Sequence, residues 1–278
     1  MAADPKNPRD RLLAAARTLG LPVPEGLDRA PLDGQVPTSN ASEASSPRPS
    51  PIRPLAMPEP PPVPHEGWTD RIRSVYDRTA RGYDLALSAF PLVGFRAGAY
   101  RRAAIEALQV RPGDTVLDIG CGTGRNLPLL ARAVGDRGRV VGLDVSTGAL
   151  DRARLRTRHL PQVELVQADA LAADLGAPDR VLATFSLSMM PDPEAVVARA
   201  TRALVPHGRV AVLDFRIPRA WPALVQTAAF ALVEPLGETW EMARRDLRPV
   251  LHQHAPLDTD RSFYFGAATL GAGAPPSR

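Results

Sequence analysis

Five short apolar runs alternate with amphipathic stretches over the central part of the chain. The runs cover residues 115–119, 140–143, 163–166, 181–185 and 210–213. Each run is nearly continuous, which is typical of strands covered on both faces of a parallel sheet. Apolar residues recur at helical spacing between them, over residues 124–134, 146–157 and 192–204. This alternation predicts an α/β fold with a doubly wound, mostly parallel sheet.

Two further elements are expected after the fifth strand. Residues 221–233 have the pattern of an apolar helix, and residues 263–270 that of a last strand. No long crossover precedes this last strand, so it is predicted to run antiparallel at the edge of the sheet.

The first 66 residues differ in composition from the rest. Fifteen of the 30 prolines fall in residues 1–64, and serines are mixed into the proline-rich stretch. Such a segment buries too little apolar surface to fold. We therefore expect the following regions: a tail with a short helix over 1–35, a disordered linker over 36–66, a folded domain over 67–272 and a C-terminal tail over 273–278.

Composition and charge exclude several classes of function. The 278 residues carry a net charge of +4 and one cysteine, Cys121. One cysteine excludes an intramolecular disulfide and a cysteine-rich metal site, and no metal is expected. The basic residues are scattered, so no nucleic-acid partner is expected. The chain has no apolar run of about 18 residues and no signal-like start, which predicts a cytoplasmic protein.

A glycine-rich loop follows the first strand. Asp118 lies near the end of the apolar run, and Gly120, Gly122 and Gly124 follow at every second position before a helix opens. Ligands of open parallel sheets bind at the carboxyl ends of the strands, and glycine lets the backbone approach them closely. A phosphate favours G-x-G-x-x-G without a preceding acid. A carboxylate at the pocket floor suits an amino group or a sulfonium instead, so NAD is disfavoured.

Two more acids follow strand ends. Asp144 ends the second strand, where a carboxylate is placed to accept hydrogen bonds from both ribose hydroxyls. Asp169 follows the third strand and is placed to accept one from an adenine amine. A single acid of this kind is more often a helix cap or a loop charge. Three acids in order describe a nucleoside that carries a positive charge and no phosphate.

The Asp-x-Gly-x-Gly-x-Gly loop and its spaced acids resemble those of class I S-adenosylmethionine-dependent methyltransferases, over residues 70–272. The resemblance implies a seven-stranded, Rossmann-like sheet with an extra edge hairpin, and S-adenosyl-L-methionine as cofactor. It places the glycines at the methionine moiety, Asp144 at the ribose and Asp169 with Ala170 at the adenine. The expected cofactor-binding residues are Tyr76, Tyr83, Asp118, Gly120, Cys121, Gly122, Gly124, Asn126, Asp144, Val145, Asp169, Ala170, Phe185 and Ser186.

Other stretches bear on the methyl acceptor. Gly-Arg-Asn at 124–126, Leu-Ser-Met-Met-Pro-Asp at 187–192 and Val-Leu-Asp-Phe at 212–215 resemble the N-methyltransferases of phospholipid and betaine-lipid headgroups. A Tyr-Asp segment resembles the lid of quinone and lipid methyltransferases, with Tyr83 and Tyr76 over the cofactor. This resemblance implies a lipid-headgroup amine as acceptor. The alternatives are C-methylation of a ubiquinone or menaquinone precursor and a non-catalytic cofactor-binding module.

Few side chains are candidates for acid–base chemistry. Asp192 follows the fourth strand and is placed to take a proton from an amine, with Tyr83 as a second candidate. Asp192 also fits a helix N-cap, because a proline and a glutamate follow it. His252 and His254 form an H-x-H pair on a predicted edge segment, but a metal would need a third ligand. Cys121 lies between glycines and is too constrained to act as a nucleophile.

The apolar helix predicted at residues 221–233 is too short to span a bilayer. It is either buried or in contact with the membrane interface. The second reading makes the protein peripheral at the inner face of the membrane, with a lipid or small-molecule acceptor as partner. Its candidate membrane surface consists of Trp221, Leu224, Val225 and Phe230.

Overall fold

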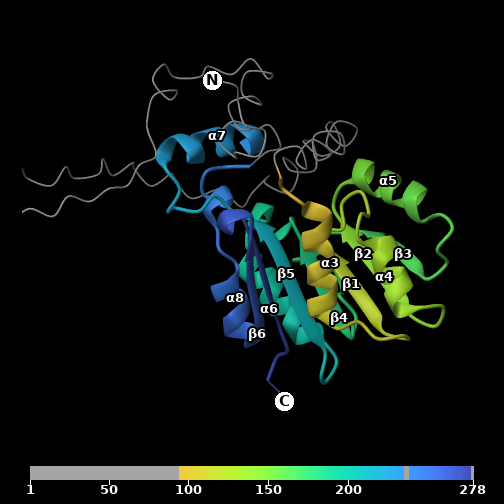
Figure 1. Ribbon diagram of the computed structural model, residues 1–278. Coiled ribbons are helices and arrows are strands. Elements are labelled where there is room, and N and C mark those ends of the chain that lie inside the picture. Colours follow the sequence, from red (N-terminus) through yellow and green to blue (C-terminus); the bar gives the residue numbers. More distant parts are fainter. Residues whose placement is uncertain (1–93, 235–237, 277–278) are drawn as a thin grey trace, which may run out of the picture. The chain divides into compact units, whose positions relative to one another are not determined.

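The structure is a computed structural model that describes residues 94–234 and 238–276 (Figure 1). The tail and linker expected over residues 1–66 lie outside the described residues, as do Tyr76 and Tyr83. None of the described helices has the length and apolar character needed to cross a bilayer.

Within the described residues, seven strands form one sheet in the order β3-β2-β1-β4-β5-β7-β6. The parallel pairs join β1 (Thr115–Ile119), β2 (Arg139–Asp144), β3 (Val163–Gln167), β4 (Arg180–Thr184) and β5 (Arg209–Phe215). All of β4 and nearly all of β5 is buried, as expected for strands covered on both faces. The predicted α/β fold with a mostly parallel, seven-stranded sheet is therefore confirmed.

The last strand, predicted at residues 263–270, is wrong in its bounds. That stretch spans the end of β6 (Leu257–Phe263), the 3-10 turn η6 (Tyr264–Gly266) and the first half of β7 (Ala268–Gly273). β7 pairs antiparallel with both β5 and β6, so a hairpin forms this edge of the sheet. Tyr264 and Phe265 adopt positive φ in this turn beside Gly266, and because sequence rules expect Gly, Asn or Asp at such positions, the pattern did not predict the turn. β7 also extends one residue into the expected C-terminal tail.

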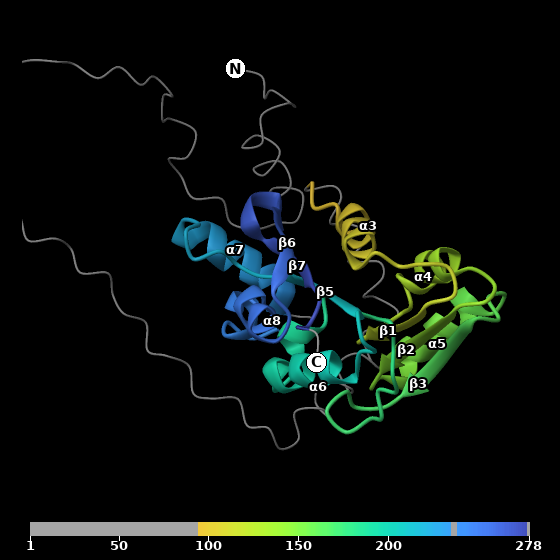
Figure 2. The same cartoon turned by 90° about the horizontal axis from the view of Figure 1, so that it is seen from below.

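Helices cover both faces of the sheet. α3 (Ala97–Leu108), α4 (Leu127–Val134) and α5 (Thr147–Thr157) contribute to the apolar core on one face. α6 (Pro193–Ala203) and α8 (Arg248–His254) contribute to the core on the other face. Figure 2 shows α3 and α4 on one side of the strands and α6 on the other.

Side-chain caps explain where two predicted helices begin. The Ser146 hydroxyl accepts a hydrogen bond from the backbone N–H of Ala149 at 3.1 Å and starts α5. The Asp192 carboxylate accepts one from the backbone N–H of Ala195 at 2.8 Å and starts α6. A side-chain oxygen at this position satisfies a backbone donor that has no partner within the helix.

Two helices were not predicted from the pattern. α3 precedes β1 and was missed altogether. α8 contains His252 and His254, so the edge segment predicted for this pair is wrong. A proline in the first turn of α8 fits the start of a helix, because that position needs no backbone N–H.

Candidate active site

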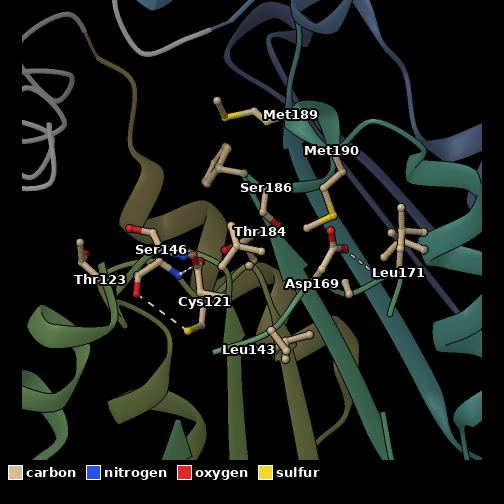
Figure 3. Close-up of a pocket in the computed structure, with 18 of the residues that line it drawn as sticks. Cys121, Thr123, Leu143, Ser146, Asp169, Leu171, Thr184, Ser186, Met189 and Met190 are labelled. Atoms are coloured by element: carbon tan, nitrogen blue, oxygen red, sulfur yellow. Dashed lines mark hydrogen bonds between the residues drawn. The ribbon is translucent and has the colours of Figure 1, made fainter. Parts of the chain in front are cut away.

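One pocket lies at the carboxyl ends of the parallel strands, with the loops after β1, β2, β3 and β4 around it (Figure 3). This edge is where open α/β sheets bind their ligands. Its lining residues are Arg101, Gly120, Cys121, Gly122, Thr123, Arg125, Leu143, Asp144, Val145, Ser146, Ala168, Asp169, Ala170, Leu171, Thr184, Phe185, Ser186, Met189, Met190, Pro191 and Val196.

Most of the cofactor-binding residues predicted from the sequence meet at this pocket. Those on its wall are Gly120, Cys121, Gly122, Asp144, Val145, Asp169, Ala170, Phe185 and Ser186. Three others, Asp118, Gly124 and Asn126, are not among its lining residues. The structure therefore brings the ends of β1, β2 and β3 together as the acid spacing predicted, with the β4 loop beside them, but Asp118 does not line the pocket.

The backbone of the glycine loop has positive φ angles that residues with a side chain rarely adopt. Gly120 has φ +66°, and a Cβ there would lie 2.5 Å from the Cβ of Ser186. Gly122 has φ +55°, and a Cβ there would meet no protein atom within 4 Å. L-residues rarely adopt such angles. The open space at Gly122 lets a ligand approach the backbone.

Asp144 fixes the loop and the pocket wall together. One carboxylate oxygen accepts a hydrogen bond from the backbone N–H of Gly122 at 2.8 Å, and the other accepts one from that of Ser146 at 2.9 Å. Asp169 accepts one from the backbone N–H of Leu171 at 2.8 Å, next to Ala170 on the wall. Both carboxylates are thus held in place by the backbone, and their predicted contacts to ribose and adenine remain predictions.

Asp118 lies behind the pocket wall and is completely buried. The amide nitrogen of Asn126 donates to both of its oxygens at 3.1 Å. Burial raises the pKa of Asp118 to about 7, against the opposing effects of Asn126 and the Arg101 guanidinium. Asp118 is not among the residues that line the pocket, so the contact with an amino group that the sequence predicts stays a prediction. Its place in the structure is to fix Asn126.

Arg101 is a pocket residue that sequence reasoning missed. It projects from α3, and its guanidinium donates to Asn126 Oδ1 at 3.2 Å and to the hydroxyl of Thr184. The same guanidinium lies 4.9 Å from the centroid of the Phe185 ring. The available signal was helical spacing, since Tyr100, Ala104 and Leu108 form the buried face of α3 beside Arg101. A positive charge therefore stands where the β1 and β4 loops meet.

The loop after β4 forms the wall opposite the glycines. Phe185 has a left-handed φ of 53°, and the Ser186 hydroxyl donates to the backbone carbonyl of Ile119 at 3.0 Å. Met189 and Met190 line the pocket above it (Figure 3). This wall is apolar apart from Ser186 and the backbone.

Charged groups hold the same loop from behind. Asp214, buried at the end of β5, accepts hydrogen bonds from the backbone N–H and the hydroxyl of Ser188, both at 2.9 Å. Arg245 donates to the backbone carbonyls of Ser188 and Met190 at 3.2 and 2.9 Å. Burial raises the pKa of Asp214, and burial together with Asp214 raises that of Glu238 to about 8. The loop is thus fixed by residues that lie far away in the sequence.

The stretch that contains the glycine loop matches a known protein family. The sequence model of the family described as "Methyltransferase domain" matches residues 116–208, which include the glycine loop and the strand-end acids. Residues 116–208 thus match a methyltransferase domain, as the glycine loop and the spaced acids predicted. A 2-phytyl-1,4-naphtoquinone methyltransferase of Thermosynechococcus vestitus is 37% identical over 153 residues, 54% of this chain and 64% of that protein. A demethylmenaquinone methyltransferase of Bacillus cereus is 32% identical over the same shares. The methyltransferase domain thus aligns with less than two thirds of each relative's length.

Solved methyltransferases share the fold. Phosphoethanolamine N-methyltransferase 2 of Haemonchus contortus, solved with S-adenosyl-L-methionine, superposes with a TM-score of 0.59 at 16% identity. The match covers 74% of this chain and 60% of that one. At this identity the likeness shows the fold and does not distinguish acceptors.

The pocket of the methyltransferase domain fits S-adenosyl-L-methionine. In that case backbone-anchored Asp144 would hold the ribose, and the open face of Gly122 would lie against the methionine moiety, as predicted from the sequence. Arg101 supplies a positive charge for an α-carboxylate or for an anionic acceptor oxygen. When bound, the cofactor supplies an electrophilic methyl group on a sulfonium.

The remaining candidates have structural roles. Asp192 caps α6 and does not line the pocket, so the capping alternative is confirmed. His252 Nδ1 accepts a hydrogen bond from the backbone N–H of Leu257 at 3.2 Å. No group of three metal-ligating side chains exists within residues 94–234 and 238–276. The Cys121 thiol is buried on the pocket wall, and burial followed by the nearby carboxylates raises its pKa, which disfavours the nucleophilic thiolate.

Proposed function

We propose that the protein transfers a methyl group from S-adenosyl-L-methionine to a ring carbon of a quinol, as the quinone alternative from the sequence had it. The observation that carries the proposal is the acceptor wall. It is formed by Phe185, Met189, Met190 and Pro191, with Arg101 as its charged neighbour. The relatives that methylate a naphthoquinone and a demethylmenaquinone support the same choice.

The lipid-headgroup amine has less support. A protonated or methylated amine calls for a carboxylate beside the acceptor, because a buried cation must be paired. Asp192 is engaged as a helix cap, and Asp118 is buried behind the wall. The carboxylates on the wall, Asp144 and Asp169, already accept hydrogen bonds from backbone N–H groups.

The proposed chemistry needs an electron-rich ring carbon in line with the methyl group. Ionisation of a quinol hydroxyl makes the adjacent carbon nucleophilic, and a nearby guanidinium favours the oxyanion. The carbon–carbon bond forms as the sulfur–methyl bond breaks, and the ring proton leaves to solvent. Apolar packing by Phe185 and the two methionines would hold the flat ring, and positioning of this kind supplies much of the rate.

The test is a competition between two acceptors. The full chain would be incubated with methyl-labelled cofactor and either a prenylated 1,4-naphthoquinol without the ring methyl or phosphatidylethanolamine in mixed micelles. We expect label in the quinol fraction alone. Label in the phospholipid alone would refute the proposal and restore the amine reading. Cofactor binding without label in either product would favour the non-catalytic module.

A further inference from the structure

α7 (Ala223–Val233) is an apolar helix with one face turned outward. Leu224 and Val225 are 58% and 39% exposed, and Ala228 and Ala231 are exposed on the same side. The helix has no charged residue, and the Thr227 hydroxyl donates to the carbonyl of Ala223 at 3.0 Å. This face therefore has almost no groups that can form hydrogen bonds with water.

The inward face of α7 accounts for the other two residues of the predicted membrane surface. The Phe230 ring stacks on that of Trp240 with centroids 4.2 Å apart, and Trp221 packs against the same small core as Val233. Trp221 and Phe230 therefore pack against the protein, as the buried alternative for this helix predicted, and they are not part of its exposed surface. Leu224 and Val225 remain.

A second apolar group is brought to the same place. Phe265, in the turn η6, is 83% exposed, and its backbone carbonyl accepts a hydrogen bond from the Trp221 indole at 3.1 Å. Phe215, the last residue of β5, pairs with Ala268 just after this turn. The turn and α7 thus both lie at the carboxyl edge of the sheet, where the pocket lies. We call Leu224, Val225, Ala228, Ala231 and Phe265 the docking surface.

Arginines lie on the elements beside the docking surface: Gln226 of α7 hydrogen-bonds to Arg219 and Arg244, and Arg261 is on β6 just before η6. Arg219, Arg244 and Arg261 are exposed, and within the part of the chain that the structure describes none of them forms an ion pair. Arg244 lies over the Trp240 ring at 4.7 Å, and Arg261 over the Phe263 ring at 5.1 Å. Apolar side chains rimmed by arginines match an anionic lipid surface, in which the chains enter the headgroup layer.

A row of aromatic rings joins the docking surface to the pocket. Phe185 on the pocket wall lies 6.1 Å from Phe95, which lies 5.4 Å from Tyr264. Tyr264 in turn lies 5.7 Å from Phe265. These centroid distances are those of interacting rings. The row therefore gives a continuous apolar connection from the exposed turn to the acceptor wall.

We propose that the docking surface binds an anionic lipid bilayer and that a lipid-tailed acceptor reaches the pocket along the aromatic row. The bilayer is favoured over a protein partner because the surface offers almost no hydrogen-bonding groups, whereas protein interfaces contain about one per 100–200 Å². The nature of the acceptor rests on the proposed function, but bilayer binding does not.

The test uses the full chain and two kinds of vesicle, phosphatidylcholine alone and an equal mixture with phosphatidylglycerol. The variant Leu224→Gln/Val225→Gln/Phe265→Asn keeps helix-forming side chains in α7 and places at residue 265 a residue that tolerates its φ of 55°. Leu155→Gln is the matched control, since Leu155 is 69% exposed on α5.

We expect the wild type and the control to float with the anionic vesicles. The triple variant should bind at least about tenfold more weakly, since each apolar side chain removed contributes on burial. Wild-type binding should fall as salt rises from about 0.1 M to about 1 M and the Debye length shortens from about 10 to about 3 Å. Equal vesicle binding by wild type and triple variant would overturn the proposal.

Two further results would overturn it and name another occupant. A lower melting temperature of the triple variant with unchanged vesicle binding would show that protein of the same chain covers this face. A dimer that the variant converts to a monomer, with unchanged vesicle binding, would show that a second copy of the chain covers this face.

Methylation assays separate this proposal from the proposed function. The variant should methylate a short-chain quinol normally and a long-chain quinol in vesicles poorly, while vesicle binding without methylation of either quinol would refute only the proposed function.

Discussion

Replacing Asp118 by Asn removes an ionisable group that the fold buries completely. Asp118 is 0% exposed, and the amide of Asn126 is its side-chain hydrogen-bond donor, at 3.1 Å to each oxygen. Burial raises its pKa to about 7 despite Asn126 and Arg101, which both favour the charged form. Asn has nearly the same shape as Asp, so Asp118→Asn tests the charge more than the packing.

The pKa gives the sign and the size of the effect. An aspartate in the unfolded chain ionises near pH 3.9. Between about pH 4 and pH 7 the folded protein keeps a proton that the unfolded chain has lost, so the free energy of unfolding falls as pH rises through this window and stays lowered above it. The gap of about three pKa units corresponds to at most about 4 kcal/mol, a large part of the usual 5–15 kcal/mol of a domain.

Urea unfolding of the wild type and Asp118→Asn at about pH 5 and about pH 8 would measure this effect. The variant also carries a pH-independent disadvantage, because its amide nitrogen replaces one of the two acceptor oxygens that the Asn126 amide contacts. Its stability relative to the wild type should nevertheless improve by about 2.6 kcal/mol between the two pH values, because about a third of the full effect is already present at pH 5. Other titrating groups cancel in the difference. Parallel pH dependence of the two proteins would refute the assignment of a buried, protonatable Asp118.

Three further substitutions test the pocket. Asp144→Ala should weaken S-adenosyl-L-methionine binding by about 1–3 kcal/mol in calorimetric titration, since the ribose loses a charged acceptor, and an unchanged affinity would remove Asp144 from the site. Gly120→Ala should lower the melting temperature and reduce cofactor binding, because its Cβ would lie 2.5 Å from Ser186 and its φ is +66°; normal stability would contradict the observed loop. Arg245→Met should lower kcat with little change in cofactor affinity, since Arg245 donates to the Ser188 and Met190 carbonyls of the loop after β4 at 3.2 and 2.9 Å. An equal loss of kcat and cofactor affinity would show a general structural role.

Much of the cofactor side could be predicted from the sequence because its signals are local. The glycines and Asp144 lie directly after apolar strands, and parallel strands bring their carboxyl ends to one edge of the sheet. Asp118 shows the limit of this reasoning. Sequence position placed it at the pocket floor, but packing buries its carboxylate completely against Asn126, and it does not line the pocket.

The acceptor side could not be predicted because its contacts join distant parts of the chain. Arg101 reaches Thr184 across 83 positions, and Arg245 reaches Ser188 across 57. Neither arginine belongs to a motif, and each acts through the backbone or a neighbouring side chain. The β6–β7 turn was missed for a related reason: two aromatic residues with positive φ form it, held by packing around Phe95 and Trp221.

Calorimetric titration of the full chain with S-adenosyl-L-methionine, S-adenosyl-L-homocysteine and NAD would test whether the pocket binds a sulfur nucleoside. Asp144 is predicted to hold a ribose, and the glycine loop lacks the G-x-x-G spacing that favours a phosphate. We expect saturable binding of both sulfur nucleosides and no binding of NAD. Binding of NAD without binding of either sulfur nucleoside would contradict it.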